Sequence, residues 1–547
     1  VLGPAASPRS ISFIAFPRAA APYALLPAGT ESSYRWNPAR ARRGRRLMVD
    51  LVGSHQSSSG FRKSWSGSRH SGPPRFATLL ACRRLEVAVE RGDERPAEQR
   101  ALSATSLLER AWSEPPVIER MPMPDCRVRL AMRDGVRLDT SVWLPAGTGP
   151  WPAILLRTPY KESVLGFKRL GVLRYVEAGY ALVIQLIRGI GASEGRFTFN
   201  SPLEGPDGYD TIEWIAAQPW CDGNVGMDGS SYAAMMQLRA AAARPPHLRC
   251  IVPASPSVDF FREIPYMGGC FSRLHTLNWA HLLQIESLAE QRGGFMGPLP
   301  VLCQPEVMRR MTLRPLIDAA EGELSGDFLQ HYRDVLEHPT LDGWWRERSL
   351  GAADFAGIDV PALVVTGNFD YSYGTLALWR SLEREAPPGP RQLLIGPWDH
   401  GQCYAGGDRR HGPYEFGGAA NLDLPRLRLA FFDLHLKGGS AAPVLDARAT
   451  VFVTGANVWQ DFDRFPPPTA RRVAWHLASG GRANTAWGNG RLLPDPPAGT
   501  QPPDHFIDDP DWPFVAPLAA ARDAEFRYDA AERERDHGTL VYDSGPL

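Results

Sequence analysis

The chain has 547 residues, more than one compact core holds, which indicates two or three domains. Hydrophobic residues make up 44% of it and charged residues 22%, and 60 Lys and Arg balance 60 Asp and Glu. These values are typical of a globular protein and give no indication of a nucleic-acid partner.

No run of the sequence approaches the roughly 18 to 20 apolar residues of a membrane-spanning helix. We therefore expect no membrane partner and a cytoplasmic location. The seven cysteines are scattered and form no CxxC pair. This spacing predicts buried thiols in a reducing compartment, and no metal or other cofactor.

Residues 1–122 differ from the rest in composition. The first 80 residues hold twelve Lys or Arg against only Glu31 and Asp50, and they lack sustained apolar periodicity. This pattern predicts a disordered extension, with a nucleic-acid-binding arm and a transit peptide as alternatives. Because the chain begins with Val1, a start at Met48, Met121 or Met123 would make part of this extension non-native.

From residue 123 to 258 strand-like and helix-like segments alternate. Two strand-like segments flank Asp134-Gly135, which predicts an antiparallel hairpin. Helix-like segments at Gly208–Gln218 and Tyr232–Ala243 separate short apolar runs that are typical of buried parallel strands. The pattern predicts an α/β protein with a mostly parallel, doubly wound sheet. The apolar runs, including two that follow residue 356, are Ala153–Leu156, Ala181–Ile187, Asn224–Met227, Cys250–Pro253, Ala362–Thr366 and Gln392–Ile395.

Residues 259–355 form a helix-like insertion between two of these strands and carry Trp279, Trp344 and Trp345. We expect this insertion to cover the carboxyl ends of the strands as a helical cap. The sheet domain resumes at 356–440. From 441 to 547 short β-branched and aromatic runs, such as Ala449–Thr454 and Arg472–Leu477, predict a separate β domain.

A serine follows the strand Asn224–Met227, in the sequence Asp228-Gly-Ser-Ser-Tyr-Ala233, and an Ala-rich helix comes next. This is the strand, turn and helix context of a nucleophile elbow. The elbow needs small residues two positions to either side of the nucleophile. Ser231 has Gly229 and Ala233 there, whereas Ser230 has two larger residues, so Ser231 is the predicted nucleophile.

A serine nucleophile needs a base and an orienting acid, which follow it in the order Asp, His in this class of fold. Asp370 comes just after the strand Ala362–Thr366, and His400 just after Gln392–Ile395. Both positions are at the carboxyl ends of strands, where open α/β sheets place their sites. Asp399 is a rival acid, but it is adjacent to His400 in sequence and cannot easily reach the ring.

Two donors are candidates for an oxyanion hole. One is the backbone N–H of Tyr232, the residue after the nucleophile. The other is the hydroxyl of Tyr160, in the turn Arg157-Thr-Pro-Tyr-Lys161 after a strand. On pattern alone, Tyr160 is equally compatible with a packed aromatic residue.

With these residues the sequence resembles the cocaine-esterase and X-Pro dipeptidyl-peptidase family of α/β-hydrolases, which includes α-amino-acid ester hydrolases. The likeness runs from about residue 126 to the end. Its landmarks are Met132-Arg-Asp-Gly-Val-Arg-Leu138, Arg157-Thr-Pro-Tyr-Lys161, Arg188-Gly-Ile-Gly-Ala-Ser-Glu-Gly195, Asp207-Gly-Tyr-Asp210, Gln218-Pro-Trp220, Gly223-Asn-Val-Gly-Met-Asp-Gly-Ser-Ser-Tyr232 and Gly396-Pro-Trp-Asp-His-Gly401.

The resemblance implies a triad of Ser231, Asp370 and His400, with Tyr160 donating to the oxyanion. It also implies a helical cap and a C-terminal jelly-roll domain that Val451–Trp459 opens. A jelly roll needs about eight strands, so we expect 441–547 to hold a truncated β-sandwich. Exposed apolar surface on it would favour self-association, and a homo-oligomer is compatible with the sequence.

The function that the sequence favours is a serine hydrolase that forms an acyl-enzyme from a small ester or amide, as a carboxylesterase does. An X-Pro dipeptidyl peptidase or an α-amino-acid ester hydrolase is the alternative. Those enzymes hold a free ammonium group, for which Glu204, Asp207 and Glu263 are available. A hydrolase scaffold that only binds is a further alternative. A dinucleotide-binding reading of Gly189, Gly191 and Gly195 fails, because residue 194 is Glu.

Overall fold

The computed structural model describes most of the chain from residue 123 onward. The described residues are 123–160, 173–291, 312–371, 374–406, 409–411, 414–438, 444–484, 487–507, 509, 534 and 539–545, together with two short strands at 11–13 and 24–25. Apart from those two strands, the extension predicted for 1–122 lies outside the described residues.

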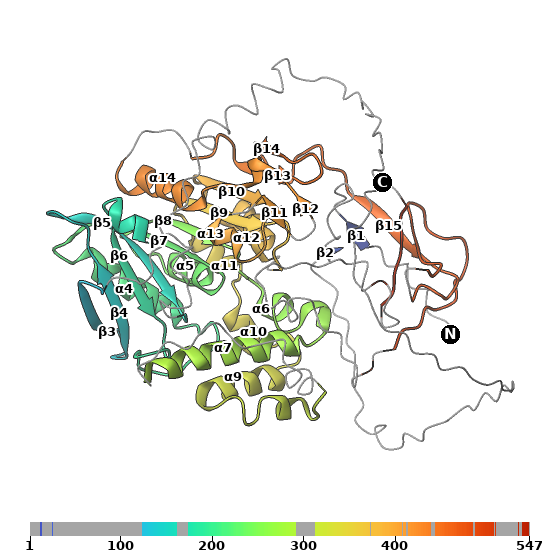
Figure 1. The fold of residues 1–547 in the computed structure, drawn as a ribbon, viewed down its shortest axis with the longest axis horizontal. Coiled ribbons are helices and arrows are strands. Elements are labelled where there is room, and N and C mark those ends of the chain that lie inside the picture. The colour runs from blue at the N-terminus through green and yellow to red at the C-terminus, as the bar shows by residue number, and fades with distance from the viewer. Residues whose placement is uncertain are drawn as a thin grey trace, which may run out of the picture. The chain divides into compact units, whose positions relative to one another are not determined.

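A ten-stranded sheet forms the centre of the fold, in the order β14-β13-β10-β9-β8-β7-β5-β6-β4-β3 (Figure 1). Its seven consecutive strands from β13 to β6 are parallel, and the pairs β3/β4, β4/β6 and β13/β14 are antiparallel. The prediction of a mostly parallel sheet is confirmed. The strands are β3 Cys126–Ala131, β4 Arg137–Trp143, β5 Trp151–Thr158, β6 Ala181–Leu186, β7 Cys221–Ser230, β8 Leu248–Ala254, β9 Ala362–Gly367, β10 Arg391–Gly396, β13 Ala449–Val453 and β14 Val458–Phe462.

The hairpin around Asp134-Gly135 forms the edge of this sheet. Leu130 pairs with Leu138, and Gly135 has a positive φ of 86° at the turn. The β3 strand alternates between exposed and buried residues, whereas β5 and β6 are buried along nearly their whole length. This difference follows from position, because an edge strand faces solvent and a central parallel strand is covered on both faces.

Helices cover both faces of the sheet, as a doubly wound fold requires. On one face α4 (Glu204–Ala216), α5 (Tyr232–Ala242) and α12 (Gly374–Glu385) pack against the strands in one hydrophobic cluster. On the other face α3 (Leu173–Glu177), α13 (Gln402–Ala405) and α14 (Leu424–Leu436) contribute to a second cluster. Each strand end is thereby held between two packed layers.

In the insertion between β8 and β9, the named elements that are described are all helices (Figure 1). Asp259 and Asp342 cap two of its helices by accepting backbone N–H groups of the first turn. Its aromatic residues share a hydrophobic cluster with Tyr232 and Met235 of α5. The insertion is thus packed onto the nucleophile side of the sheet. Its helices are α6 Phe260–Glu263, η2 Met267–Gly269, α7 Arg273–Gln291, η3 Leu316–Ala319, α9 Gly326–Glu337, α10 Gly343–Arg348 and α11 Ala352–Gly357.

The segment Ala449–Phe462 differs from its sequence-based prediction. The sequence places it at the opening of a separate β domain, but β13 pairs in parallel with β10 and β14 pairs with β13, so both strands extend the main sheet. The physical reason is burial. Ala449 and Val451 pack into one hydrophobic cluster of the sheet domain and Phe452 into another, and this covers β13 on both faces.

Beyond residue 462 the described strands are β15 (Val473–Ala478) and β16 (Arg491–Leu493). They form a small antiparallel sheet with β1 (Ile11–Phe13) and β2 (Ala24–Leu25), which is compatible with a C-terminal β domain. The described strands β11 (Arg410–His411) and β12 (Tyr414–Glu415) make a two-stranded ribbon. No helix in the described part of the chain is long and apolar enough to cross a membrane.

Candidate active site

Ser231 lies in the sharp turn between β7 and α5. Its φ of 58° and ψ of −122° are a conformation that costs a non-glycine residue energy and that active sites often hold in place. A backbone hydrogen bond of 2.9 Å from the Ser231 N–H to the Ala254 carbonyl fixes the turn to β8. The turn therefore presents the Ser231 side chain at the carboxyl edge of the sheet.

Gly229 allows strand and helix to approach at this turn. Its φ is 143°, and a Cβ atom built there would lie 2.6 Å from the Cβ atom of Ala233, far inside van der Waals contact. The Ala233 methyl group, at a position where the elbow motif has glycine, is accommodated because Gly229 has no side chain. The geometry agrees with the choice of Ser231 over Ser230.

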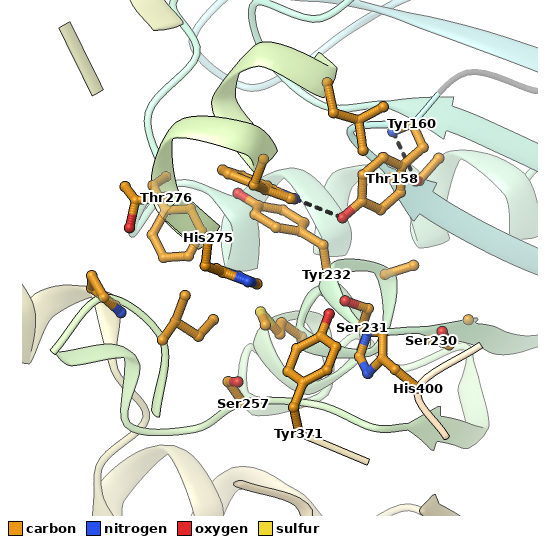
Figure 2. A pocket seen from close by; sticks show the side chains of 18 of the residues that line it. Thr158, Tyr160, Ser230, Ser231, Tyr232, Ser257, His275, Thr276, Tyr371 and His400 are labelled. Carbon is orange, nitrogen blue, oxygen red and sulfur yellow. Dashed lines mark hydrogen bonds between the residues drawn. The ribbon is translucent and has the colours of Figure 1, made fainter. Parts of the chain in front are cut away.

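Asp370 and His400 follow β9 and β10, and the structure brings them together. The distance from His400 Nδ1 to Asp370 Oδ1 is 2.8 Å, and Asp370 is only 3% exposed. The second carboxylate oxygen, Oδ2, lies 3.6 Å from the thiol of the buried Cys403. In Figure 2 the side chains of Ser231 and His400 point toward one another. The three predicted residues therefore meet at one place.

Asp399, the rival acid, does not contact His400 through its side chain. Its carboxylate accepts the backbone N–H of Gln402 at 2.9 Å and lies 3.8 Å from Nδ1 of His411. Asp399 thus caps the short helix α13 and faces another imidazole.

Two aromatic neighbours of His400 were not identified from the sequence. The ring of Tyr371 stacks on the His400 ring at 4.3 Å between centroids, and the His275 ring meets Tyr371 edge-on at 5.6 Å. Burial, with a smaller contribution from the nearby His400, lowers the pKa of His275 to about 4. His275 is therefore neutral near pH 7. Tyr371 adjoins Asp370 in sequence, which is a signal that could have identified it.

Tyr160 follows β5 and is fixed at two points. Its backbone N–H donates to Oγ1 of Thr158 at 3.1 Å, and its hydroxyl oxygen accepts the indole N–H of Trp279 at 2.8 Å (Figure 2). A phenol oxygen that accepts the indole proton can still donate its own proton, as an oxyanion hole requires. Tyr160 also packs against the hydrophobic cluster of the insertion, so these contacts are compatible with an oxyanion donor and with a packed aromatic residue.

Tyr232 contributes to the site through its backbone. It is the first residue of α5, so no carbonyl of the helix accepts its N–H. Its buried hydroxyl accepts the backbone N–H of Asn200 at 2.8 Å, and its ring stacks on Trp279 at 5.7 Å. The side chain therefore packs against the insertion while the N–H lies beside the nucleophile.

A cavity of about 350 Å³ opens onto these groups and is bounded by both the sheet domain and the helical insertion. None of its described lining side chains is Asp, Glu, Lys or Arg. Aromatic side chains and small or apolar ones form most of its wall. The lining residues include Tyr160, Phe199, Ser231, Tyr232, His275, Trp279, His331, Trp345, Tyr371 and His400.

The three acids considered for binding an ammonium group do not line this cavity. Glu204 lies 3.0 Å from the Arg157 guanidinium, and Asp207 pairs with Arg188 at 2.6 Å, both deep in the protein. Glu263 is buried and accepts the Val258 N–H at 2.8 Å, and burial raises its pKa to about 8. These carboxyl groups serve the packing of the fold instead.

Comparison with known proteins identifies the chain's relatives. Residues 134–402 match the family described as X-Pro dipeptidyl-peptidase (S15 family). The cocaine esterase of Rhodococcus sp. is 33% identical over 399 residues, which cover 70% of this chain and 67% of that protein. The chain belongs to this hydrolase family. A second relative, named as a putative serine esterase of Mycobacterium bovis, is 26% identical. The match covers 70% of this chain and 65% of that protein.

Solved structures of relatives share the fold. An aminopeptidase from a marine sediment archaeon, Thaumarchaeota archaeon, superimposes with a TM-score of 0.58 at 25% identity, over 76% of this chain and 72% of that one. An α-amino-acid ester hydrolase has a TM-score of 0.54 at 24% identity, over 75% and 70% of the two chains. As a member of this family, the chain is a hydrolase of esters or amides with an α/β-hydrolase fold.

Proposed function

We propose that the chain is a carboxylesterase whose substrates have an uncharged, aromatic acyl group. The observation that carries the proposal is the cavity, because its described wall is aromatic and holds no carboxylate or cationic side chain. A free ammonium group would lose its hydration there without gaining an ion pair, which is costly. An uncharged aryl group gains apolar and ring contacts instead.

In the proposed mechanism Ser231 is the nucleophile, His400 the base and Asp370 the orienting acid. His400 takes the Ser231 hydroxyl proton through Nε2 while Oγ attacks the ester carbonyl carbon. The hydrogen bond to Asp370 keeps the other ring proton on Nδ1 and stabilises the charged imidazolium. The Tyr160 hydroxyl and the Tyr232 N–H donate to the oxyanion.

The tetrahedral intermediate then breaks its bond to the leaving oxygen, which receives the proton from His400. A water molecule, deprotonated by His400, attacks the acyl-enzyme in the second half of the reaction. The acid is released, and Ser231 recovers its proton. Each step uses a group that already lines the cavity.

A pair of matched esters tests the proposal. Phenylacetic and phenylglycine esters of one alcohol differ only in the ammonium group. We expect kcat/KM, divided by each ester's alkaline hydrolysis rate, to favour the phenylacetyl ester by at least about tenfold, in keeping with the cost of an unpaired buried charge. Ser231→Ala is the control for background hydrolysis.

An X-Pro dipeptidyl peptidase is the second candidate. It is favoured by the family description and by the similarity to the archaeal aminopeptidase. An Ala-Pro anilide distinguishes the two, since efficient turnover of it, or a preference for the phenylglycine ester, would contradict the esterase proposal. Labelling of Ser231 by a fluorophosphonate would exclude the third candidate, a scaffold that only binds.

A further inference from the structure

The described contacts among lining rings set apart two groups of side chains on the cavity wall. His400, Tyr371 and His275 form one group of touching rings. The rings of Phe199, Trp279 and His331 form another, and the described ring contacts do not join the two groups. The end that holds this second group, together with Trp345, is named the aromatic end.

The chemistry of the proposed reaction assigns each end to one part of the substrate. His400 must protonate the leaving oxygen, so the alcohol portion lies on the His400 side. The oxyanion points to Tyr160 and Tyr232, and both residues contact Trp279, so the reacting carbonyl lies beside the aromatic end. The acyl substituent extends from this carbonyl away from His400, which favours the aromatic end as the part of the cavity that receives it.

His331, on α9, is the polar side chain of the aromatic end. Its ring is stacked on Phe199 at 5.2 Å between centroids and is edge-on to Trp279 at 5.7 Å and to Phe197 at 5.9 Å. The residue is 5% exposed and lines the cavity. Three neighbouring rings therefore hold the imidazole in a fixed orientation.

The two ring nitrogens of His331 are not equivalent. Nδ1 is buried and has no hydrogen-bond partner among the described residues, so Nε2 is the nitrogen that can meet a ligand in the cavity. Burial lowers the pKa of His331 to about 3, so the ring is neutral and carries one proton. An unpartnered buried N–H is rarer in proteins than an unpartnered acceptor. This favours the tautomer with the proton on Nε2.

We infer that His331 is a specificity-determining residue that donates a hydrogen bond from Nε2 to an acceptor oxygen on the acyl group. The implied substrates are esters of aromatic acids whose ring carries an oxygen substituent, such as a methoxy group. The inference rests on the proposed esterase function and deepens it. It assigns to α9 a role in recognition that the triad does not need.

Methoxy and ethyl groups provide the test, because they are similar in size and only the methoxy group accepts a hydrogen bond. The substrates are 4-nitrophenyl esters of the three methoxybenzoic and the three ethylbenzoic acids. For each ring position the ratio of kcat/KM, methoxy over ethyl, is measured in wild type and in His331→Phe. Comparing the two enzymes on the same ester cancels the electronic effect of the methoxy group.

We expect the ratio to fall about tenfold in His331→Phe at one ring position, the size of one lost hydrogen bond. His331→Gln should keep most of the wild-type ratio, because its amide nitrogen lies near the place of Nε2. His331→Leu replaces His331→Phe if the latter does not fold.

Two results would overturn the inference in distinguishable ways. Hydrolysis of these esters with ratios that His331→Phe and His331→Leu leave unchanged at all three positions would exclude a role for Nε2 while the proposed function stands. The proposed function itself would be overturned if folded wild-type protein hydrolysed none of the six esters and no phenylacetyl ester.

Discussion

The sheet edge and the helical insertion supply the same cavity in different ways. Ser231, Asp370 and His400 each follow a strand directly, so the backbone of the sheet sets their positions. His275, Trp279 and His331 project from helices, so packing sets their positions, and Trp279 is also held by its hydrogen bond to Tyr160. We infer that the sheet edge carries the reaction and the insertion carries recognition, with Trp279 as the point where the two meet.

Ser231→Ala is the strongest test of this division. The variant should fold and lose about 10⁴-fold or more in kcat, because no other group can form the acyl-enzyme. Steady-state kinetics together with a thermal unfolding curve would check both parts. Ser230→Ala, its neighbour in the turn, is the matched control and should retain activity. Loss of activity in the control alone would show that the elbow has been assigned to the wrong serine.

Tyr160→Phe should lower kcat by about 10²- to 10³-fold with little change in KM, since its hydroxyl acts on the oxyanion of the transition state. The measurement is kcat and KM for one aryl ester. A variant within about threefold of wild type, well short of the loss of an oxyanion donor, would return Tyr160 to a packing role.

Trp279→Phe tests the contact between the two regions, because it removes the indole N–H of the insertion that donates to the Tyr160 hydroxyl. We expect kcat to fall about threefold to tenfold, the size of one hydrogen bond. The same substitution in the Tyr160→Phe background should have little further effect on kcat, since the bond is already lost. Additive effects in this double-mutant cycle would contradict the coupling.

The smallest effect concerns stability at low pH. The pKa values of His275 and His331 are lowered by burial, to about 4 and about 3. Below about pH 6.5 the unfolded chain binds protons that the folded protein does not, so the free energy of unfolding falls as pH falls toward 4. The slope is at most about 1.4 kcal/mol per pH unit for each histidine.

Urea unfolding of wild type and His331→Phe between pH 4 and 7 measures this slope. The variant should show the flatter dependence, because it lacks one of the two groups. Parallel profiles would indicate that folding does not lower the pKa of His331.

The same division explains how much the sequence could predict. Short apolar runs mark the buried strands, and the order Ser, Asp, His after those strands predicted a triad that the structure brings together. Tyr371 has only its adjacency to Asp370 as a signal, and His331 has none of this kind, because its position depends on how α9 of the insertion packs over the sheet. In sequence, an isolated histidine in an amphipathic helix cannot be distinguished from a residue that is buried only for packing.

The strand β13 shows a second feature that the sequence could not predict, namely the sheet that a strand joins. Its β-branched and aromatic residues predicted a strand, and a strand forms. Nothing in five residues specifies which sheet a strand joins, because pairing with β10 depends on contacts far away in the sequence. The residue pattern therefore predicted the type of element but not the sheet that it joins.

The hydrogen bond between Trp279 and Tyr160 divides the insertion into parts with unequal freedom to change. Substitutions in α7 near Trp279 alter the contacts of Tyr160, the proposed oxyanion donor, so we expect selection for activity to restrain them. Among the described contacts, His331 on α9 makes no hydrogen bond to the reacting groups and meets them only through other rings. Laboratory evolution toward new acids should accordingly accumulate its first tolerated substitutions in α9.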